Sequence, residues 1–267
     1  MPTTTILARL SAFVVFGTVV MGAVVCATNS SASCPNWPGC YDGQFTPEFQ
    51  LNPIIEFVHR VFSMTCAPFV LVMGILLRKH HDRRVRLLPW VALAGALGAG
   101  IFGMFTILTG LSPVASMIDL WCALTALVCM VLTTRLLYAT QFDATRARIA
   151  GYAVVGVAAL YGMGVLVAGD GSFTRCIGWP LGFIIDADHA APLQILRVIL
   201  AVALIGVFLW LRSLPVLFAL ATELVLGIVI RTSGLTDLLG SLYGAVAVCI
   251  IALAAWQWGN HQYAAGA

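Results

Sequence analysis

The residue types best suited to chemistry lie within one stretch, from Cys34 to Arg60. Cys34 and Cys40 enclose five residues, two of them proline, and a disulfide across so short a loop is feasible. Glu56, His59 and Arg60 follow where a long apolar segment begins, and ionisable groups that enter hydrocarbon are costly and usually functional. Spacings of three and four residues place Glu56 on the same helical face as His59 and Arg60. This stretch therefore predicts a polar site at the mouth of a helix.

Each of these three ionisable residues has a structural interpretation beside a functional one. His59 is either a metal ligand or a hydrogen-bonded structural histidine. Glu56 either moves a proton or simply pairs with Arg60. Arg60 either binds an anionic group or extends its guanidinium to lipid head groups. These residues alone leave the alternatives open.

The elements that must position this site are membrane-spanning helices. The chain of 267 residues is 61% hydrophobic and 9% charged, whereas soluble proteins have about 25% charged residues. No part of it has the composition of a separate soluble domain or of a nucleic-acid-binding protein. The first apolar segment also fits a cleaved secretory signal, but it is long enough to span, so we interpret it as a retained helix. Eight segments are long and apolar enough to cross a bilayer: 6–27, 51–77, 88–110, 114–138, 149–168, 191–211, 214–231 and 236–257.

The distribution of basic residues predicts the orientation of these helices. Most of them fall on one side of the eight-helix topology, and the positive-inside rule assigns that side to the cytoplasm. We therefore expect a multi-pass protein of the plasma membrane with both termini in the cytoplasm and the two longest loops outside. The basic residues of the predicted cytoplasmic side are Arg9, Arg78, Lys79, Arg83, Arg84, Arg86, Arg135, Arg146, Arg148 and Arg212.

The predicted outer position of the first long loop bears on its cysteines. An oxidising compartment favours a disulfide between Cys34 and Cys40, and two free thiols in an ordered loop are the alternative. Cysteines within apolar helices behave as small buried hydrophobic residues, and we expect no chemistry from them. They are Cys26, Cys66, Cys122, Cys129 and Cys249.

The two halves of the chain resemble each other. The loop sequence from Cys34 to Cys40 is echoed from Cys176 to Gly182, with the tryptophan and the following proline in matched places. Arg60 aligns with Arg197. A repeat of four helices keeps its orientation in the membrane, so we expect two pseudo-symmetric four-helix bundles, residues 1–144 and 145–267, in an all-α membrane protein.

The repeat places two positions opposite each other near the outer end of each bundle. In the first bundle they are His59 and Asp119, and in the second they are Leu196 and Ser241. Bundle interiors hold cofactors by side chains from facing helices. An unpaired carboxylate at this depth would be protonated, so Asp119 either bonds to His59 across the bundle or stays neutral. Because the two residues lie at equivalent depth, we expect a direct contact between them. Because both halves keep the arginine, an anionic partner is favoured for Arg60 and Arg197.

Taken together, these motifs resemble the haem A synthase family. The resemblance rests on the Trp-Pro loop with its cysteines, Glu-x-x-His-Arg from Glu56 to Arg60, and Thr-Gly-Leu-Ser-Pro from Thr109 to Pro113, and it covers nearly the whole chain. It implies oxidation of the C8 methyl of haem O to the formyl group of haem A, with a substrate haem in one bundle and a b-type haem in the other. The implied partners are membrane lipids, haem O or a related haem, and haem O synthase or oxidase assembly proteins.

Carried over to this chain, the resemblance assigns roles to five residues. Glu56 is the catalytic candidate, moving a proton or carrying a covalent link. His59 is the candidate ligand of the haem iron. The cofactor-binding candidates are His59, Arg60, Asp119 and Arg197.

The chain departs from the family where iron would be bound. The family places an axial histidine on the second and fourth helices of each bundle, and here those positions hold His59, Asp119, Leu196 and Ser241. Leucine cannot ligate iron, and serine and aspartate are poor substitutes for imidazole. We therefore expect no bis-histidine b-haem in the second bundle. The alternatives to an enzyme are a non-catalytic relative that binds haem or assists oxidase assembly, and a membrane protein that binds through its polar outer loops.

Overall fold

The computed structural model describes residues 2–138, 143–168, 172–180 and 191–262. Within these residues the chain is helical, without a β-strand, and eight of its helices are long and apolar enough to cross a membrane. This confirms the all-α, multi-pass prediction. The elements are α1 (Pro2–Ala27), α2 (Leu51–Leu77), α3 (Arg83–Leu108), α4 (Pro113–Leu136), α5 (Ala144–Val167), η1 (Phe173–Arg175), α6 (Ala191–Trp210), α7 (Leu214–Ser233) and α8 (Asp237–Asn260).

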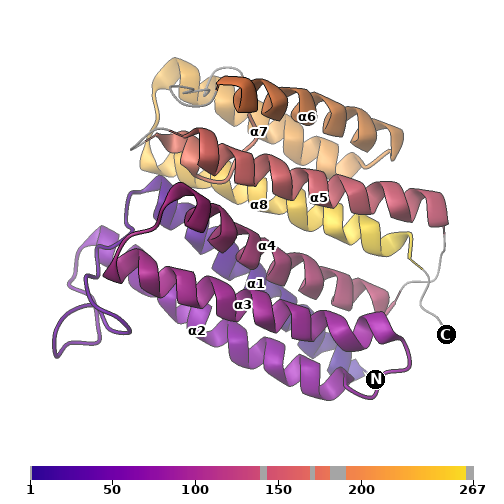
Figure 1. Ribbon diagram of the computed structural model, residues 1–267, viewed down its shortest axis with the longest axis horizontal. Coiled ribbons are helices and arrows are strands. Elements are labelled where there is room, and N and C mark those ends of the chain that lie inside the picture. Colours follow the sequence, from indigo (N-terminus) through magenta and orange to yellow (C-terminus); the bar gives the residue numbers. More distant parts are fainter. Residues whose placement is uncertain (1, 139–142, 169–171, 181–190, 263–267) are drawn as a thin grey trace.

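The helices run side by side and form two groups of four (Figure 1). Contacts join each helix to the next within a group, and the α1–α4 and α5–α8 contacts close each group. The groups meet through α1 against α8 and through α4 against both α5 and α8. The pseudo-symmetry between them and the division at residue 144 stay predictions.

All long helices have one end at the same basic surface. We call this the basic end, and it carries the α2–α3 connection, the first turn of α5 and the N-terminal end of α1 (Figure 1). Two helices begin earlier here than their apolar segments do. Asp82 accepts a hydrogen bond from the Arg84 amide and Asp143 accepts one from the Arg146 amide, so each aspartate caps a basic first turn that apolarity alone does not reveal.

The opposite end, which we call the outer end, carries the loop of residues 28–50 and the segment after α5 (Figure 1). Two disulfides lie there. The predicted bond between Cys34 and Cys40 is confirmed. A second bond joins Cys26 to Cys176, 150 residues apart in the sequence, with their Cα atoms 5.7 Å apart.

The expectation that Cys26 has no chemistry was therefore wrong. Cys26 occupies the last turn of α1, at the outer rim of the helix, and the segment after α5 folds back far enough to bring Cys176 to it. The other four helix cysteines are unpaired. These are Cys66, Cys122, Cys129 and Cys249.

The disulfide pattern makes a countable prediction. Alkylation of the denatured, unreduced protein should label four cysteines, and alkylation after reduction should label all eight. Cys26→Ser should add Cys176 to the labelled set and lower the free energy of unfolding by about 2–4 kcal/mol, measured as a lower apparent melting temperature in detergent. Cys122→Ser is the control, because that thiol is unpaired. An unchanged melting temperature in Cys26→Ser would contradict a structural role for the bond.

Candidate functional site

The outer loop of the first half is held by a buried ion pair. The Arg60 Nη2 atom donates to Glu56 Oε1 at 2.6 Å and to the Cys34 carbonyl at 2.7 Å. Its Nη1 atom donates to the carbonyls of Asn36 at 2.6 Å and Gly39 at 2.7 Å. The second carboxylate oxygen of Glu56 accepts from the Cys34 amide at 2.8 Å. One arginine and one glutamate therefore satisfy four backbone groups of the disulfide loop.

The predicted pairing of Glu56 with Arg60 is thus confirmed. The two residues are only 4% and 7% exposed, and buried charges of this kind persist when they are paired and hydrogen-bonded. Both Nη atoms of Arg60 face the loop, and only its Nε lacks a partner among the described residues. This geometry makes Arg60 a loop anchor. The catalytic role of Glu56 and a direct contact of Arg60 with a cofactor stay predictions.

Arg197 holds the second outer segment in a matching way. Its Nη2 atom donates to the Gly178 carbonyl at 2.9 Å and its Nε to the Leu160 carbonyl at 3.1 Å. In the sequence repeat Arg197 matches Arg60 and Gly178 matches Asn36. Arginines at matched positions therefore bind carbonyls at matched positions, which gives both a structural role in their loops.

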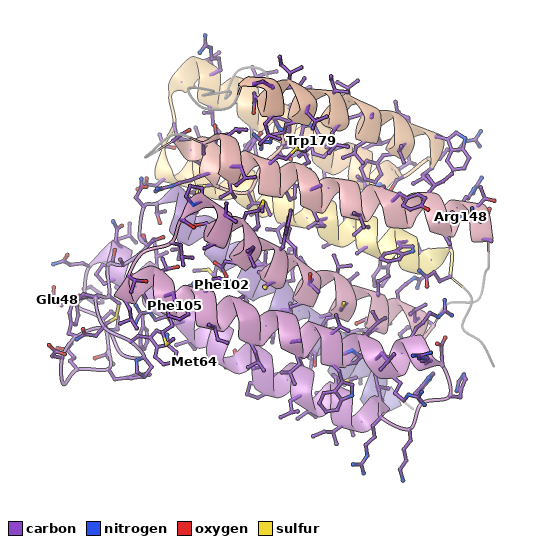
Figure 2. All side chains as sticks on the ribbon, viewed as in Figure 1. Glu48, Met64, Phe102, Phe105, Arg148 and Trp179 are labelled. Atoms are coloured by element: carbon purple, nitrogen blue, oxygen red, sulfur yellow. A yellow bond between two sulfur atoms is a disulfide. The ribbon has the colours of Figure 1, made fainter. Side chains whose placement is uncertain are left out.

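The second outer segment is buried much more deeply than the first. Trp179 is 5% exposed, whereas its counterpart Trp37 is 45% exposed. Glu223 Oε1 accepts from the Trp179 amide at 2.9 Å, and the Tyr243 hydroxyl donates to the Trp179 carbonyl at 2.6 Å. A Cβ added to Gly178 would lie 2.5 Å from the Tyr243 ring, so only glycine permits this approach. Figure 2 shows Trp179 within the second group of helices.

The outer half of the first group is, in contrast, open. No residue of α3 is buried beyond Gly95, and the first buried residue of α4 is Leu124. A Cβ built on Gly103 would meet no atom within 4 Å. Phe102 and Phe105 lie along this part of α3 (Figure 2). In a closed four-helix bundle some residues of α3 and α4 at these levels would be buried, so the outer parts of these two helices pack loosely against the rest of the group.

His59 and Asp119 lie beside this open half. Both are half-buried. A Cβ on Gly22 would lie 3.4 Å from His59 Nε2, so the imidazole packs against α1. Trp121 donates from its indole to the Ala158 carbonyl of α5 at 2.9 Å. Because two residues correspond to about 200° around a helix, Asp119 points away from α5, toward the first group.

The structure does not bring His59 and Asp119 together directly. These two described residues share neither a hydrogen bond nor an ion pair, so the predicted contact is not present. The described residues also contain no cluster of three His, Cys, Asp or Glu side chains able to hold a metal ion. Any iron bound here would therefore depend on single side chains from separate helices.

The matched positions of the second group contain no candidate iron ligand. Leu196 is 52% exposed, on the outside of α6, and Ser241 is half-buried in α8. Neither supplies an imidazole or a thiolate. Among the buried polar groups of this half, Glu223 and Tyr243 are engaged with Trp179.

Two of these contacts were not among the sequence predictions. The sequence places Glu223 inside a helix without indicating that its partner is a loop amide. The Cys26–Cys176 bond had a usable signal, because both cysteines lie next to predicted outer loops, where oxidation favours pairing.

The anchoring pair makes a stability prediction. Glu56→Ala leaves the Arg60 guanidinium buried without its counter-charge, and breaking a buried pair in this way costs about 3–5 kcal/mol. Denaturant unfolding in detergent should report this loss, and proteolysis within residues 28–50 should become faster. Glu48→Ala, at an exposed site in the same loop, is the control and should change neither. Equal behaviour of the two variants would contradict the anchoring role.

The comparison with known proteins is consistent with this arrangement. No curated protein matches the chain. A model of the family described as cytochrome oxidase assembly protein (COX15-CtaA) matches residues 5–259, a range that includes both outer loops and the eight spanning helices. This confirms the resemblance drawn from the motifs. The chain belongs to the cytochrome oxidase assembly family that includes the haem A synthases.

Proposed function

We propose that this protein is a haem A synthase-type enzyme that binds one haem, in the outer half of the group α1–α4. The observation that carries the proposal is the difference between the halves. In the first, the outer parts of α3 and α4 beside His59 and Asp119 bury no residue, and in the second the corresponding region is filled by its own loop. Family membership supplies the role in oxidase assembly.

The residues beside the open space fit a haem in part. His59 would supply the imidazole that haem iron commonly takes as a ligand. Asp119 is a poor second ligand and would serve better as a polar group near the ring. The open interior at Gly103 leaves room for a planar apolar group between helices. The residues of the second group do not fit, since Leu196 faces outward and Trp179 packs inside.

The reaction expected of such a site is oxidation of a haem methyl group to a formyl group. Converting the methyl to the formyl group takes an oxygen atom from water and releases four electrons and four protons, so the reaction requires an external electron acceptor. The protein would orient the methyl group and provide a path for the protons. Glu56 is bound to Arg60 and to the Cys34 amide. Asp119 has no hydrogen-bond partner among the described residues and borders the open half, where an unpaired carboxyl group is neutral. We therefore assign Asp119 the relay of protons, giving up its own proton as it takes the next. Arg60 and Arg197 would then act through the loops they hold.

A second candidate function is that of a non-catalytic haem-binding relative that assists oxidase assembly. The observation in its favour is the packed second half, which has no histidine at either matched position. In both cases we place the protein in the plasma membrane with its basic end in the cytoplasm, receiving a haem O-type haem from a haem O synthase.

A coupled expression experiment tests the function. In a host that lacks its own haem A synthase and contains haem O synthase, the wild-type protein should purify with about one haem per chain, and haem A should appear in the membranes. His59→Ala should lose most of the bound haem, because the iron loses its imidazole. His81→Ala, in the exposed α2–α3 connection, is the matched control. Bound haem without haem A would favour the second candidate, and a stable colourless protein would contradict both.

The location of the haem makes a separate prediction. Gly103→Leu should occupy the open half and lower the haem content several-fold without lowering the unfolding temperature, because a Cβ at this position meets no atom within 4 Å. Gly206→Leu is the matched control, since this glycine of α6 is also free of neighbours but is exposed on the outside. Absorbance at the Soret band per chain is the measurement. Loss of haem in the control alone would place the site elsewhere.

A further inference from the structure

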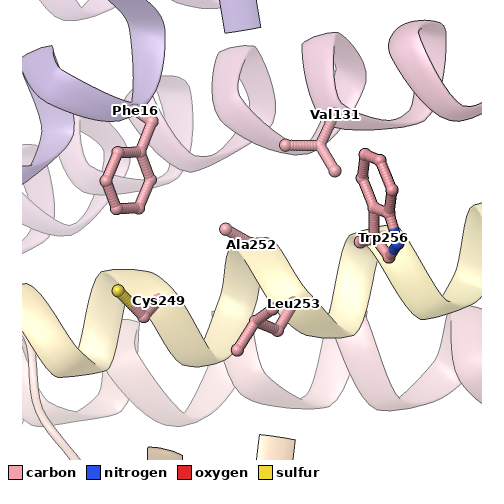
Figure 3. Close-up of a pocket in the computed structure, with 6 residues that line it drawn as sticks. All are labelled: Phe16, Val131, Cys249, Ala252, Leu253 and Trp256. Atoms are coloured by element: carbon pink, nitrogen blue, oxygen red, sulfur yellow. The ribbon is translucent and has the colours of Figure 1, made fainter. Parts of the chain in front are cut away.

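A pocket between the two helix groups carries an inference independent of the haem site. Its volume is about 270 Å³, and its lining is entirely apolar. Phe16 of α1, Val131 of α4 and Trp256 of α8 form its walls together with three other residues of α8 (Figure 3). These are Cys249, Ala252 and Leu253. We propose that this pocket, with Arg9 and Arg135 beside it, binds one anionic phospholipid.

The position of the pocket favours a lipid of the leaflet at the basic end. Val131 lies in the last two turns of α4 and Trp256 in the last two turns of α8, both close to that end. The walls come from both groups, so a molecule in the pocket contacts α1, α4 and α8 at once. An apolar lining of this kind suits hydrocarbon.

Two arginines flank the pocket at the basic end. The Arg135 guanidinium carbon lies 4.8 Å from the centre of the Trp256 ring. That of Arg9 lies 5.1 Å from the centre of the Tyr138 ring. Arg9 precedes Phe16 by seven residues, which is about two turns along the same helical face.

Arg9 lies on α1 and Arg135 on α4, and a hydrogen bond joins these two helices next to the arginines. The Thr134 hydroxyl donates to the Ala8 carbonyl at 3.2 Å, directly beside both arginines in the sequence. The Nε atom of Arg135 also donates to the Asn260 side chain. Both cations are therefore held next to the pocket by aromatic and amide groups.

No carboxylate neutralises either arginine within the described part of the chain. The acidic residues of the basic end are Asp82 and Asp143, and they pair with Arg84 and Arg146. The sequences of residues 139–142 and 263–267 contain no acidic residue. The charge of Arg9 and Arg135 is thus available to an external anion, and guanidinium groups bind phosphate well.

The combination of features selects the ligand. A free phosphate would use the arginines and leave the pocket unused. A neutral isoprenoid would use the pocket and leave the arginines unused. An anionic phospholipid such as phosphatidylglycerol uses both, with an acyl chain in the pocket and its phosphate beside the guanidinium groups.

Native mass spectrometry of the full chain in detergent tests this proposal. Phosphatidylglycerol should bind more tightly than phosphatidylcholine with the same acyl chains. Arg9→Gln should weaken phosphatidylglycerol binding about fivefold, because one basic residue at a membrane surface contributes about that factor. Ala252→Phe, which fills the pocket, should weaken binding of both lipids. Arg148→Gln is the matched control, since this exposed arginine lies at the same end on α5, away from the pocket (Figure 2).

Several results would overturn the proposal. They are equal affinity of the wild type for the two lipids, an equal loss in Arg148→Gln, full displacement of phosphatidylglycerol by inorganic phosphate, and copurification of a neutral isoprenoid that phosphatidylglycerol does not displace. Arg135→Gln is a further test of the second arginine, but this substitution also removes the hydrogen bond to Asn260. If that variant does not fold, Arg9→Gln and Ala252→Phe still decide the question.

Discussion

At the outer end of this protein, loop backbone packs against membrane helices. The peptide groups of that backbone need hydrogen-bond partners, and the structure of this end depends on the side chains that provide them. Peptide groups removed from water need partners, and an irregular segment cannot provide enough of its own. Arg60 and Arg197 answer this need with guanidinium groups that each reach more than one carbonyl. Arginine suits the task because it offers five donors in a fixed plane and stays charged. Glu56 and Glu223 accept hydrogen bonds from loop amides in the same two regions.

These hydrogen bonds from arginine and glutamate hold the two outer segments in different positions. In the first half the disulfide of Cys34 and Cys40 keeps the loop outside the bundle, with Trp37 partly exposed, and the outer parts of α3 and α4 bury nothing. In the second half Trp179 enters the bundle and occupies its interior. The two groups of helices therefore differ most at their outer ends, where the second is packed with its own loop and the outer parts of α3 and α4 in the first are not.

The fold was predictable from the sequence to a large extent, because apolar length determines whether a helix can span a bilayer. The starts of α3 and α5 were missed because Asp82 and Asp143 cap turns made of basic residues, which apolarity does not detect. The pairing of Glu56 with Arg60 followed from helical spacing. The partner of Glu223 lies in a segment whose path depends on tertiary packing, so no local pattern could identify it. The partner of Cys26 lies in the same segment, and the position of both cysteines next to outer loops was the available signal. Whether His59 and Asp119 touch was likewise a question of helix separation.

The bond between Cys26 and Cys176 has a consequence for biosynthesis. Cys26 is translated and inserted well before Cys176 exists, and during that interval Cys34 and Cys40 are the nearest other thiols. Correct pairing therefore requires that Cys34 and Cys40 bond to each other first, which the small size of their loop favours. Cys26 then remains a free thiol until Cys176 is translated. Maturation of the first half would then finish only after the fifth helix is in the membrane, so the protein becomes covalently complete as a whole and not half by half.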